Sequence, residues 1–351
     1  MRALVLWGLF LTVLALFWLD LVPRLHHEAE AKCLTANGPT AKRFCSLLIS
    51  TGWHKSPPGL LRQARGRIAF SEGDYRLAVR DFKAAQKLEL HLDQTEFWLG
   101  RALYERKRYD ESIDAFSRAL DAGDGPRSLI WRGWAAMKTD HAQAVADFDA
   151  VEAGPGYDAF KRWVHRGRGE MLTHLARYDE AISDLMIARE LEPKDAWVTG
   201  MLSWASREKG DYRAALYWAD ATLGLSPTYR WGHQLRGQVL FQLGRYKEAL
   251  EEFDWLLEQN FRRGHHMMQK AEALIRLGDH ELAVETLIAR REAGWSDLQL
   301  SVGLIRAHCA LGETEKAVEQ AKDALRHFAD LAWFSPDIAG DPSQVCRLRA
   351  E

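Results

Sequence analysis

Small and bulky apolar residues recur along this chain at an interval close to 34 residues. One small residue repeats eight times, at successive intervals of 34, 32, 37, 34, 34, 34 and 34 residues. Its occurrences are Ala78, Ser112, Ala144, Ala181, Ala215, Ala249, Ala283 and Ala317. Four positions later a bulky residue returns to the same helical face, as at Phe82, Phe116, Phe148, Leu185, Phe253 and Leu287. The interval predicts an array of helix-turn-helix units and not a closed enzyme domain.

Other residues of the same pattern mark where each helix packs, ends and begins. A second small residue precedes the first by eleven or twelve positions, at Gly66, Gly100, Gly133, Gly169 and Gly237. Five positions before the repeating small residue, a glycine is expected to end the first helix in a left-handed conformation. These glycines are Gly73, Gly210, Gly244, Gly278 and Gly312. Pro193 and Pro227 then end the second helices of their units.

Four segments carry this pattern most completely: GDYRLAVRDFKAA, RYDEAISDLMIARELEP, GDYRAALYWADATLGLSP and GRYKEALEEFDWLL. They resemble the second helix of the tetratricopeptide repeat, and the resemblance covers residues 59–330. It implies an all-α superhelical solenoid of about eight helix-turn-helix repeats, in which each repeat contacts only its neighbours.

The amino-terminal end departs from the repeat. Residues 3–19 (ALVLWGLFLTVLALFWL) carry no charge, at the short end of the roughly 17 to 25 residues that span a bilayer. A cleaved signal peptide has a shorter apolar core, and Trp7 and Trp18 near the two ends disfavour a buried core helix. We expect residues 1–22 to be a transmembrane anchor, or uncleaved signal, with residues 3–19 in the lipid bilayer. Arg2 favours a cytoplasmic amino terminus, with the repeats on the extracytoplasmic side, the periplasm in a bacterium.

The four cysteines lie outside any C-x-x-C motif. Residues 23–58 are expected to be a linker, in which a Cys33–Cys45 disulfide would staple an unstructured segment. Two free thiols are the alternative, because spacing does not determine pairing. Cys309 is expected to be a small buried residue of the eighth repeat. Cys346 lies in the polar carboxy-terminal tail, residues 331–351, for which disorder is expected.

The first helices of the repeats supply the expected binding surface, because they line the concave face of such a solenoid. The predicted groove consists of Arg67, Trp98, Arg101, Arg127, Trp131, Trp134, Trp163, Arg166, Trp197, Trp204 and Trp231. Each ring taken singly favours packing between repeats. The set favours a ligand surface, since tryptophan and arginine are enriched at binding hot spots.

Binding is predicted and catalysis is not. No nucleophile motif is present, and neither a metal nor a cofactor is expected. His265 and His266 are adjacent in a helix and diverge in direction, so they are expected to be a solvated or groove-facing pair and not metal ligands. A formal net charge of −2 gives no overall basic signature for nucleic acid.

These features predict a membrane-anchored adaptor or scaffold that holds a protein partner and serves the assembly or stabilisation of a cell-envelope complex. The alternative is a carbohydrate-binding repeat protein that supports polysaccharide export or cell-wall processes, with the rings as platforms for a glycan. A scaffold that faces the cytoplasm is a third and weaker interpretation.

Overall fold

The computed structural model describes residues 27–52, 54–88, 94–327 and 345–346, and every regular element in these residues is helical. Residues 27–35 are the first helical stretch. The chain divides into two compact units, residues 1–175 and 176–351.

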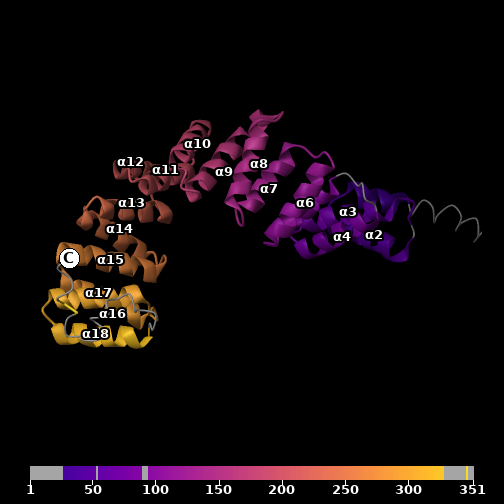
Figure 1. The fold of residues 1–351 in the computed structure, drawn as a ribbon. Coiled ribbons are helices and arrows are strands. Elements are labelled where there is room, and N and C mark those ends of the chain that lie inside the picture. Colours follow the sequence, from indigo (N-terminus) through magenta and orange to yellow (C-terminus); the bar gives the residue numbers. More distant parts are fainter. Residues whose placement is uncertain (1–26, 53, 89–93, 328–344, 347–351) are drawn as a thin grey trace, which may run out of the picture. The chain divides into compact units, whose positions relative to one another are not determined.

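The first unit is a series of helical hairpins (Figure 1). It contains α2 (Pro39–Thr51), α3 (Pro58–Ser71), α4 (Tyr75–Leu88), α5 (Thr95–Glu105), α6 (Tyr109–Asp121), α7 (Pro126–Ala136), α8 (His141–Glu152), the 3-10 helix η1 (Tyr157–Ala159) and α9 (Lys161–His174). The first helices of successive repeats also touch: α3 contacts α5, α5 contacts α7, and α7 contacts α9. Their outward faces therefore form one surface.

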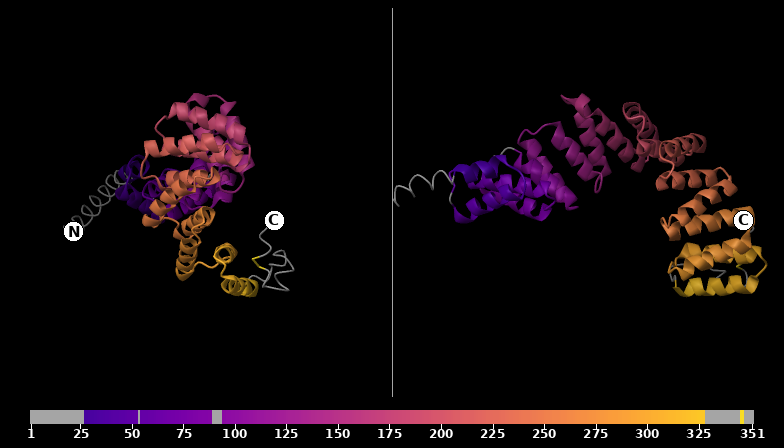
Figure 2. Two further views of the ribbon diagram at one scale, coloured as in Figure 1. Left: turned by 90° about the vertical axis from the view of Figure 1, so that its left-hand side faces the viewer. Right: turned by 180° about the vertical axis from the view of Figure 1, so that it is seen from behind.

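The second unit repeats the arrangement, as Figure 2 shows from two further sides. It contains α10 (Tyr178–Leu191), α11 (Ala196–Lys209), α12 (Tyr212–Leu225), α13 (Arg230–Gln242), α14 (Tyr246–Glu258), α15 (Arg263–Leu277), α16 (His280–Glu292), α17 (Leu298–Ala310) and α18 (Thr314–His327). Aspartates cap several of these helices. Asp195, Asp211, Asp279 and Asp297 each accept hydrogen bonds from backbone N–H groups of the first turn.

A ring packed on a glycine holds the two helices of a repeat together. A Cβ atom added at Gly100 on α5 would lie 2.7 Å from Cε1 of Phe116 on α6, closer than a real Cβ could approach. Gly66 and Gly237 meet Phe82 and Phe253 in the same way. The eight repeating small residues are all fully buried, as the 34-residue interval predicts.

Where serine replaces a small apolar residue, its hydroxyl finds a partner across the hairpin. Ser112 Oγ donates to the carbonyl oxygen of Gly100 at 2.8 Å, and Ser203 Oγ donates to that of Ala215 at 2.8 Å. The same close approach that excludes large side chains brings the carbonyl within reach, so neither buried hydroxyl is left unsatisfied.

The glycines expected to end first helices have positive φ, from 74° at Gly244 to 91° at Gly210. In the second and fourth repeats the equivalent residues are Lys107 and Ala176, which adopt the same left-handed conformation at φ 58° and 59°. The turn geometry is therefore set by the packing of the hairpin, even where glycine is missing.

Buried arginine–carboxylate pairs join the helices of three repeats. Arg65 donates from Nε and Nη2 to Asp81 at 2.7 and 2.8 Å, and Asp81 is fully buried. Arg132 pairs with Asp147 and Arg236 pairs with Glu252 at the equivalent positions. Each arginine directly precedes the small glycine, so its head lies beside the ring contact. Sequence reasoning missed these pairs, although the Arg-Gly dipeptide recurs.

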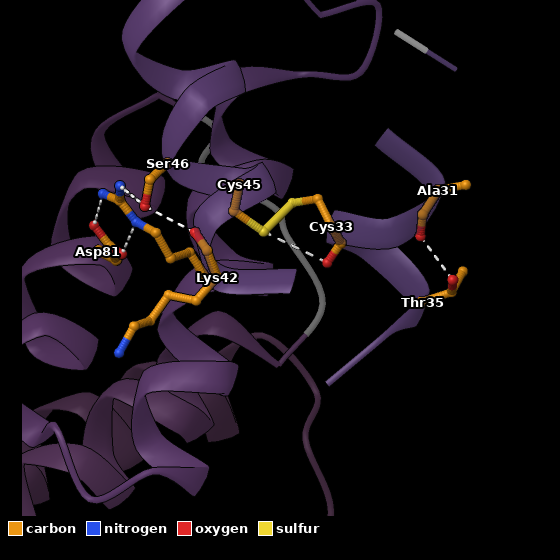
Figure 3. The surroundings of a disulfide bond; sticks show 8 residues. Ala31, Cys33, Thr35, Lys42, Cys45, Ser46 and Asp81 are labelled. Atoms are coloured by element: carbon orange, nitrogen blue, oxygen red, sulfur yellow. Dashed lines mark hydrogen bonds and ion pairs between the residues drawn. A yellow bond between two sulfur atoms is a disulfide. The ribbon is translucent and has the colours of Figure 1, made fainter. Parts of the chain in front are cut away.

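Within the expected linker, residues 27–35 and 39–51 are helical. Residues 27–35 and α2 form a helical pair bridged by a Cys33–Cys45 disulfide (Figure 3). Both cysteines are buried with Leu48 against Leu61 and Ile68 of α3. Ser46 on α2 accepts a hydrogen bond from Arg65 at 3.1 Å, so the pair docks on the first repeat. Apolar residues at helical spacing, including Ala41, Cys45 and Leu48, favour this folding over a loop.

The carboxy-terminal cysteines also correct an expectation. Cys309 on α17 and Cys346 form a disulfide, so neither is a free thiol. Val345 is buried beside Ile305, Ala317 and Ala321. A disulfide over 37 residues of sequence cannot be deduced from spacing. Of the predicted tail, residues 331–351, only Val345 and Cys346 are among the described residues.

No helix among the described residues is long and apolar enough to cross a membrane. The expected anchor, residues 1–22, lies outside the described residues. Its role stays a prediction.

The ring contact predicts opposite effects for two glycine-to-alanine substitutions. Gly100→Ala should lower the free energy of unfolding by about 1–2 kcal/mol, because the added Cβ displaces the buried ring of Phe116. Gly224→Ala, in α12 with open space around it, should raise that free energy by up to about 1 kcal/mol through helix propensity. Urea unfolding followed by circular dichroism measures both. Equal effects at the two sites would contradict the packing argument.

Candidate functional site

Aromatic rings and one guanidinium group follow each other across the first helices of the first unit. Phe70 on α3 packs edge-on against Trp98 on α5, with ring centroids 5.4 Å apart. Trp131 and Trp134 on α7 are 4.7 Å apart, and Trp134 lies 5.4 Å from Trp163 on α9. Arg101 on α5 bridges the two groups. We call this set, Phe70, Trp98, Arg101, Trp131, Trp134 and Trp163, the ring surface.

Arg101 lies at the centre of the ring surface. Its guanidinium carbon is 3.7 Å from the ring centroid of Trp131, 5.1 Å from that of Phe70 and 5.8 Å from that of Trp98. Such cation–π contacts stabilise a guanidinium group without neutralising it. Among the described residues Arg101 makes no ion pair, and its Nε atom is buried without a hydrogen-bond acceptor. A buried donor without an acceptor costs free energy. The Arg101 side chain as a whole is half-buried, so part of it is open to solvent.

Burial and neighbouring charges shift the pKa of Arg101. Burial lowers the pKa of Arg101, and the positive charge of Arg127 lowers it further, while Glu105 and Tyr75 oppose the shift. The side chain stays protonated near neutral pH, since its ordinary pKa lies far above 7. The ring surface therefore holds a cation that the described part of the protein leaves without a bound anion.

Trp98 is the second orphaned donor. Its Nε1 atom is buried and has no hydrogen-bond partner among the described residues. The guanidinium group of Arg67, an exposed residue of α3, lies 5.3 Å from the Trp98 ring centroid. Trp98 and Arg101 are three residues apart on α5, so both face the same surface.

The remaining predicted residues of the first unit lie around the ring surface. Arg127, at the start of α7, lies over the ring of Phe97 at 3.8 Å and 3.8 Å from a carboxylate oxygen of Asp124. Arg166 follows Trp163 by three residues on α9. Its charge, with that of Lys138, lowers the pKa of Glu170, but burial outweighs both and raises that pKa.

The predicted tryptophans of the second unit have local roles. The Trp231 ring occupies the space above Gly200, where an added Cβ would lie 2.6 Å from Cζ3 of the ring. Trp204 donates from Nε1 to Glu208 at 3.1 Å. Trp197 is half-buried at the start of α11. Trp231 thus packs between two first helices, as expected for a single ring.

Sequence reasoning missed two aromatic members of the first unit. Phe70 and Tyr104 lie three residues after Arg67 and Arg101, near the ends of their helices. Tyr104 packs edge-on against Trp131 at 5.6 Å. The two rings occupy equivalent positions in consecutive repeats, and this regularity in the sequence could have identified them. Restricting the groove to earlier positions of each first helix overlooked them.

A small cavity of about 180 Å³ opens on the first helices of the second unit. Its lining is Gln238, Phe241, Gln242, Phe253, Gln269 and Glu272. Glu272 is already paired with Arg276 and Arg306. The cavity therefore presents amide groups and an aromatic wall, without an uncompensated charge.

The two adjacent histidines do not form the solvated pair that the sequence suggested. His266 is fully buried, with its ring stacked near Phe253 and Phe261, whereas His265 is exposed. Nδ1 of His266 lies 3.0 Å from Oε1 of Gln269. No cluster of three or more potential metal ligands occurs in the described ranges.

Comparison with protein families identifies the repeat. The tetratricopeptide repeat model matches residues 64–127 and 235–297. The Hsp70-Hsp90 organizing protein of Triticum aestivum is 26% identical over 155 residues, which is 44% of this chain and 25% of the relative. The chain thus matches about a quarter of that relative's length.

Solved structures agree on the fold. A tetratricopeptide repeat protein from Parabacteroides merdae ATCC 43184 superposes with a TM-score of 0.55 at 14% identity, covering 70% of this chain and 97% of the other. PilW, described as a widely conserved type IV pilus biogenesis factor, superposes with a TM-score of 0.50 at 17% identity, covering 57% and 93%. The chain therefore contains tetratricopeptide repeats in an all-α solenoid. The comparisons indicate no catalytic family.

His266 predicts how stability depends on pH. Burial lowers its pKa to about 4, with smaller contributions from His265 and Arg262, while the unfolded chain titrates near 6.5. Between pH 6.5 and 4 only the unfolded state binds this proton, so the free energy of unfolding should fall, by up to about 3 kcal/mol, as the pH falls. His266→Phe should remove this component. Urea unfolding at pH 7, 6, 5 and 4 tests it, and identical slopes for both proteins would contradict it.

Proposed function

We propose that this protein is a membrane-anchored tetratricopeptide-repeat adaptor that holds a protein partner on the ring surface. The proposed role is the assembly or stabilisation of a cell-envelope complex. One observation carries the proposal: Arg101 lies among three rings and makes no ion pair within the described ranges, and its Nε atom is buried without an acceptor.

A protein partner suits this chemistry better than a small apolar ligand. Tryptophan and arginine carry a large share of binding free energy at protein interfaces. The half-buried side chain of Arg101 can donate to oxygen acceptors, which a polypeptide provides through carbonyl and carboxylate groups. The half-buried rings of Trp131, Trp134 and Trp163 offer apolar area beside this side chain. The surface thus combines anchoring contacts with directional ones.

The anchor and the location rest on separate observations. The uncharged run at residues 3–19 is long enough to span a bilayer as a helix. All four cysteines are paired in two disulfides, which persist mainly in oxidising compartments. Together they support a single-pass protein with a cytoplasmic amino terminus and extracytoplasmic repeats, periplasmic in a bacterium.

Substitutions on the ring surface test the adaptor role. The triple variant Trp131→Ala, Trp134→Ala, Trp163→Ala should recover its native partner at least tenfold less efficiently than the wild type, because hot-spot rings each contribute roughly 2 kcal/mol or more. The measurement is affinity purification of the full chain from its native membrane in mild detergent, with mass spectrometry.

Tyr217→Ala supplies the matched control. Tyr217 is an aromatic residue of α12 that is 61% exposed and far from the ring surface in sequence. It should leave recovery unchanged, and circular dichroism should show that the triple variant folds. Undiminished recovery by a folded triple variant would refute the adaptor role on this surface. Retardation of the wild type, but not the triple variant, in a polysaccharide affinity gel would favour the glycan alternative.

Thiol labelling tests the location. Protein extracted from its native cells without reductant should not react with a maleimide polymer under denaturing conditions, and after reduction it should gain four adducts, one per cysteine. A reporter that is active only outside the cytoplasm should work when fused after residue 351. Reactive thiols before reduction, with an inactive reporter, would indicate a cytoplasmic repeat domain.

A further inference from the structure

The residue that directly follows the small glycine changes along the first unit from basic, through aromatic, to acidic. It is Arg67 on α3, Arg101 on α5, Trp134 on α7 and Glu170 on α9. In the first three repeats the preceding glycine meets a phenylalanine of the second helix, at Gly66, Gly100 and Gly133. Shared packing gives these three helices the same rotation, so Arg67, Arg101 and Trp134 occupy one row across touching helices. Glu170 holds the equivalent sequence position on α9, which contacts α7.

The residue before the glycine is an arginine in three of these four repeats, and Leu99 takes its place before Gly100. Arg65 pairs with Asp81, Arg132 pairs with Asp147, and Arg168 pairs with Asp149 and Glu152. The residues of the row have no such partners within the described ranges. Arg67 and Arg101 contact rings. Among the described residues Glu170 makes neither an ion pair nor a hydrogen bond, although the charges of Lys138 and Arg166 act on it from a distance. The protein thus joins one set of charges in direct ion pairs, and in the described ranges the other set has none.

Glu170 lies close enough to the ring surface for its charge to act on a neighbouring ring, Tyr104. Burial raises its pKa, and its negative charge contributes to the raised pKa of Tyr104, whose ring packs against Trp131. The row therefore runs from two cations, across apolar rings, to an anion. This order favours a ligand whose charges have the opposite order, because opposite charges attract at both ends of the row and like charges repel.

We propose that the ring surface recognises an extended polypeptide segment with an acidic residue at Arg67 and Arg101, an apolar residue on Trp134, and a basic residue at Glu170. This inference rests on the proposed adaptor function and specifies the partner for it. Two steps between packed helices, from α5 to α9, span roughly 16–20 Å. An extended chain advances about 3.3 Å per residue, so the two charges of the segment lie about five or six residues apart.

Three fluorescein-labelled peptides test the charge order. Each has ten residues, with the same prolines and leucines between two charged positions six residues apart. The pairs are Glu and Lys, Glu and Glu, and Lys and Lys. Fluorescence anisotropy with the full chain in mild detergent should give the Glu/Lys peptide an affinity about fivefold higher than either like-charged peptide. A Glu/Lys peptide with a spacing of two residues should lose this advantage.

Single charge reversals should switch the preference. Arg101→Glu should favour the Lys/Lys peptide, and Glu170→Lys should favour the Glu/Glu peptide. Glu170→Gln, a milder change at this half-buried site, should abolish the preference for Glu/Lys over Glu/Glu. Arg80→Glu on α4 and Asp121→Lys on α6 are matched controls, because both residues are exposed on second helices. They should leave the ranking unchanged.

Three results would overturn the charge order. Equal affinities for the three peptides, equal effects of a reversal on all of them, or no binding at millimolar concentration would each do so. None of these results bears on the tryptophan variants in the affinity purification. Loss of the native partner from the triple variant, with no peptide preference, would keep the adaptor function and reject the charge order.

Discussion

The close contact between a glycine of the first helix and a ring of the second helix is the constraint on which each repeat depends. It sets the distance between the helices at Gly66, Gly100 and Gly237, where no Cβ fits beneath the ring. Other features follow from that distance. Ser112 and Ser203 reach carbonyl oxygens across the hairpin, and Lys107 and Ala176 accept a left-handed backbone that glycine adopts more cheaply.

The same contact divides the polar residues of the first helices into two classes. A residue before the glycine lies close to the second helix, and there Arg65 and Arg132 pair with buried carboxylates. A residue after the glycine lies on the face shared by neighbouring first helices, and there Arg67 and Arg101 lie on rings. Two residues along the helix, a rotation of about 200°, thus separate an arginine that is ion-paired inside the repeat from one that lies on rings, because side chains advance by about 100° per residue.

A disulfide-linked segment covers the first repeat, and another covers the last repeat. At the amino end, Cys33 and Cys45 lie within an apolar cluster that covers α3, and Ser46 joins the Arg65–Asp81 pair. At the carboxy end, Cys346 is tied to α17 while Val345 covers Ile305 and Ala321. A solenoid exposes the apolar face of its terminal repeats, and such caps shield that face from water.

The all-α class, the repeat length and the small buried residues could be predicted from the sequence, because these depend on contacts inside one hairpin and recur in every repeat. The sequence also identified most members of the ring surface, since tryptophan and arginine at equivalent positions are visible without coordinates. The sequence did not reveal that Arg65 is ion-paired while Arg101 has no ion pair among the described residues, that Trp231 packs on Gly200, or that Cys309 pairs with Cys346. Those outcomes depend on which side chains from different helices meet, and only the tertiary structure decides that.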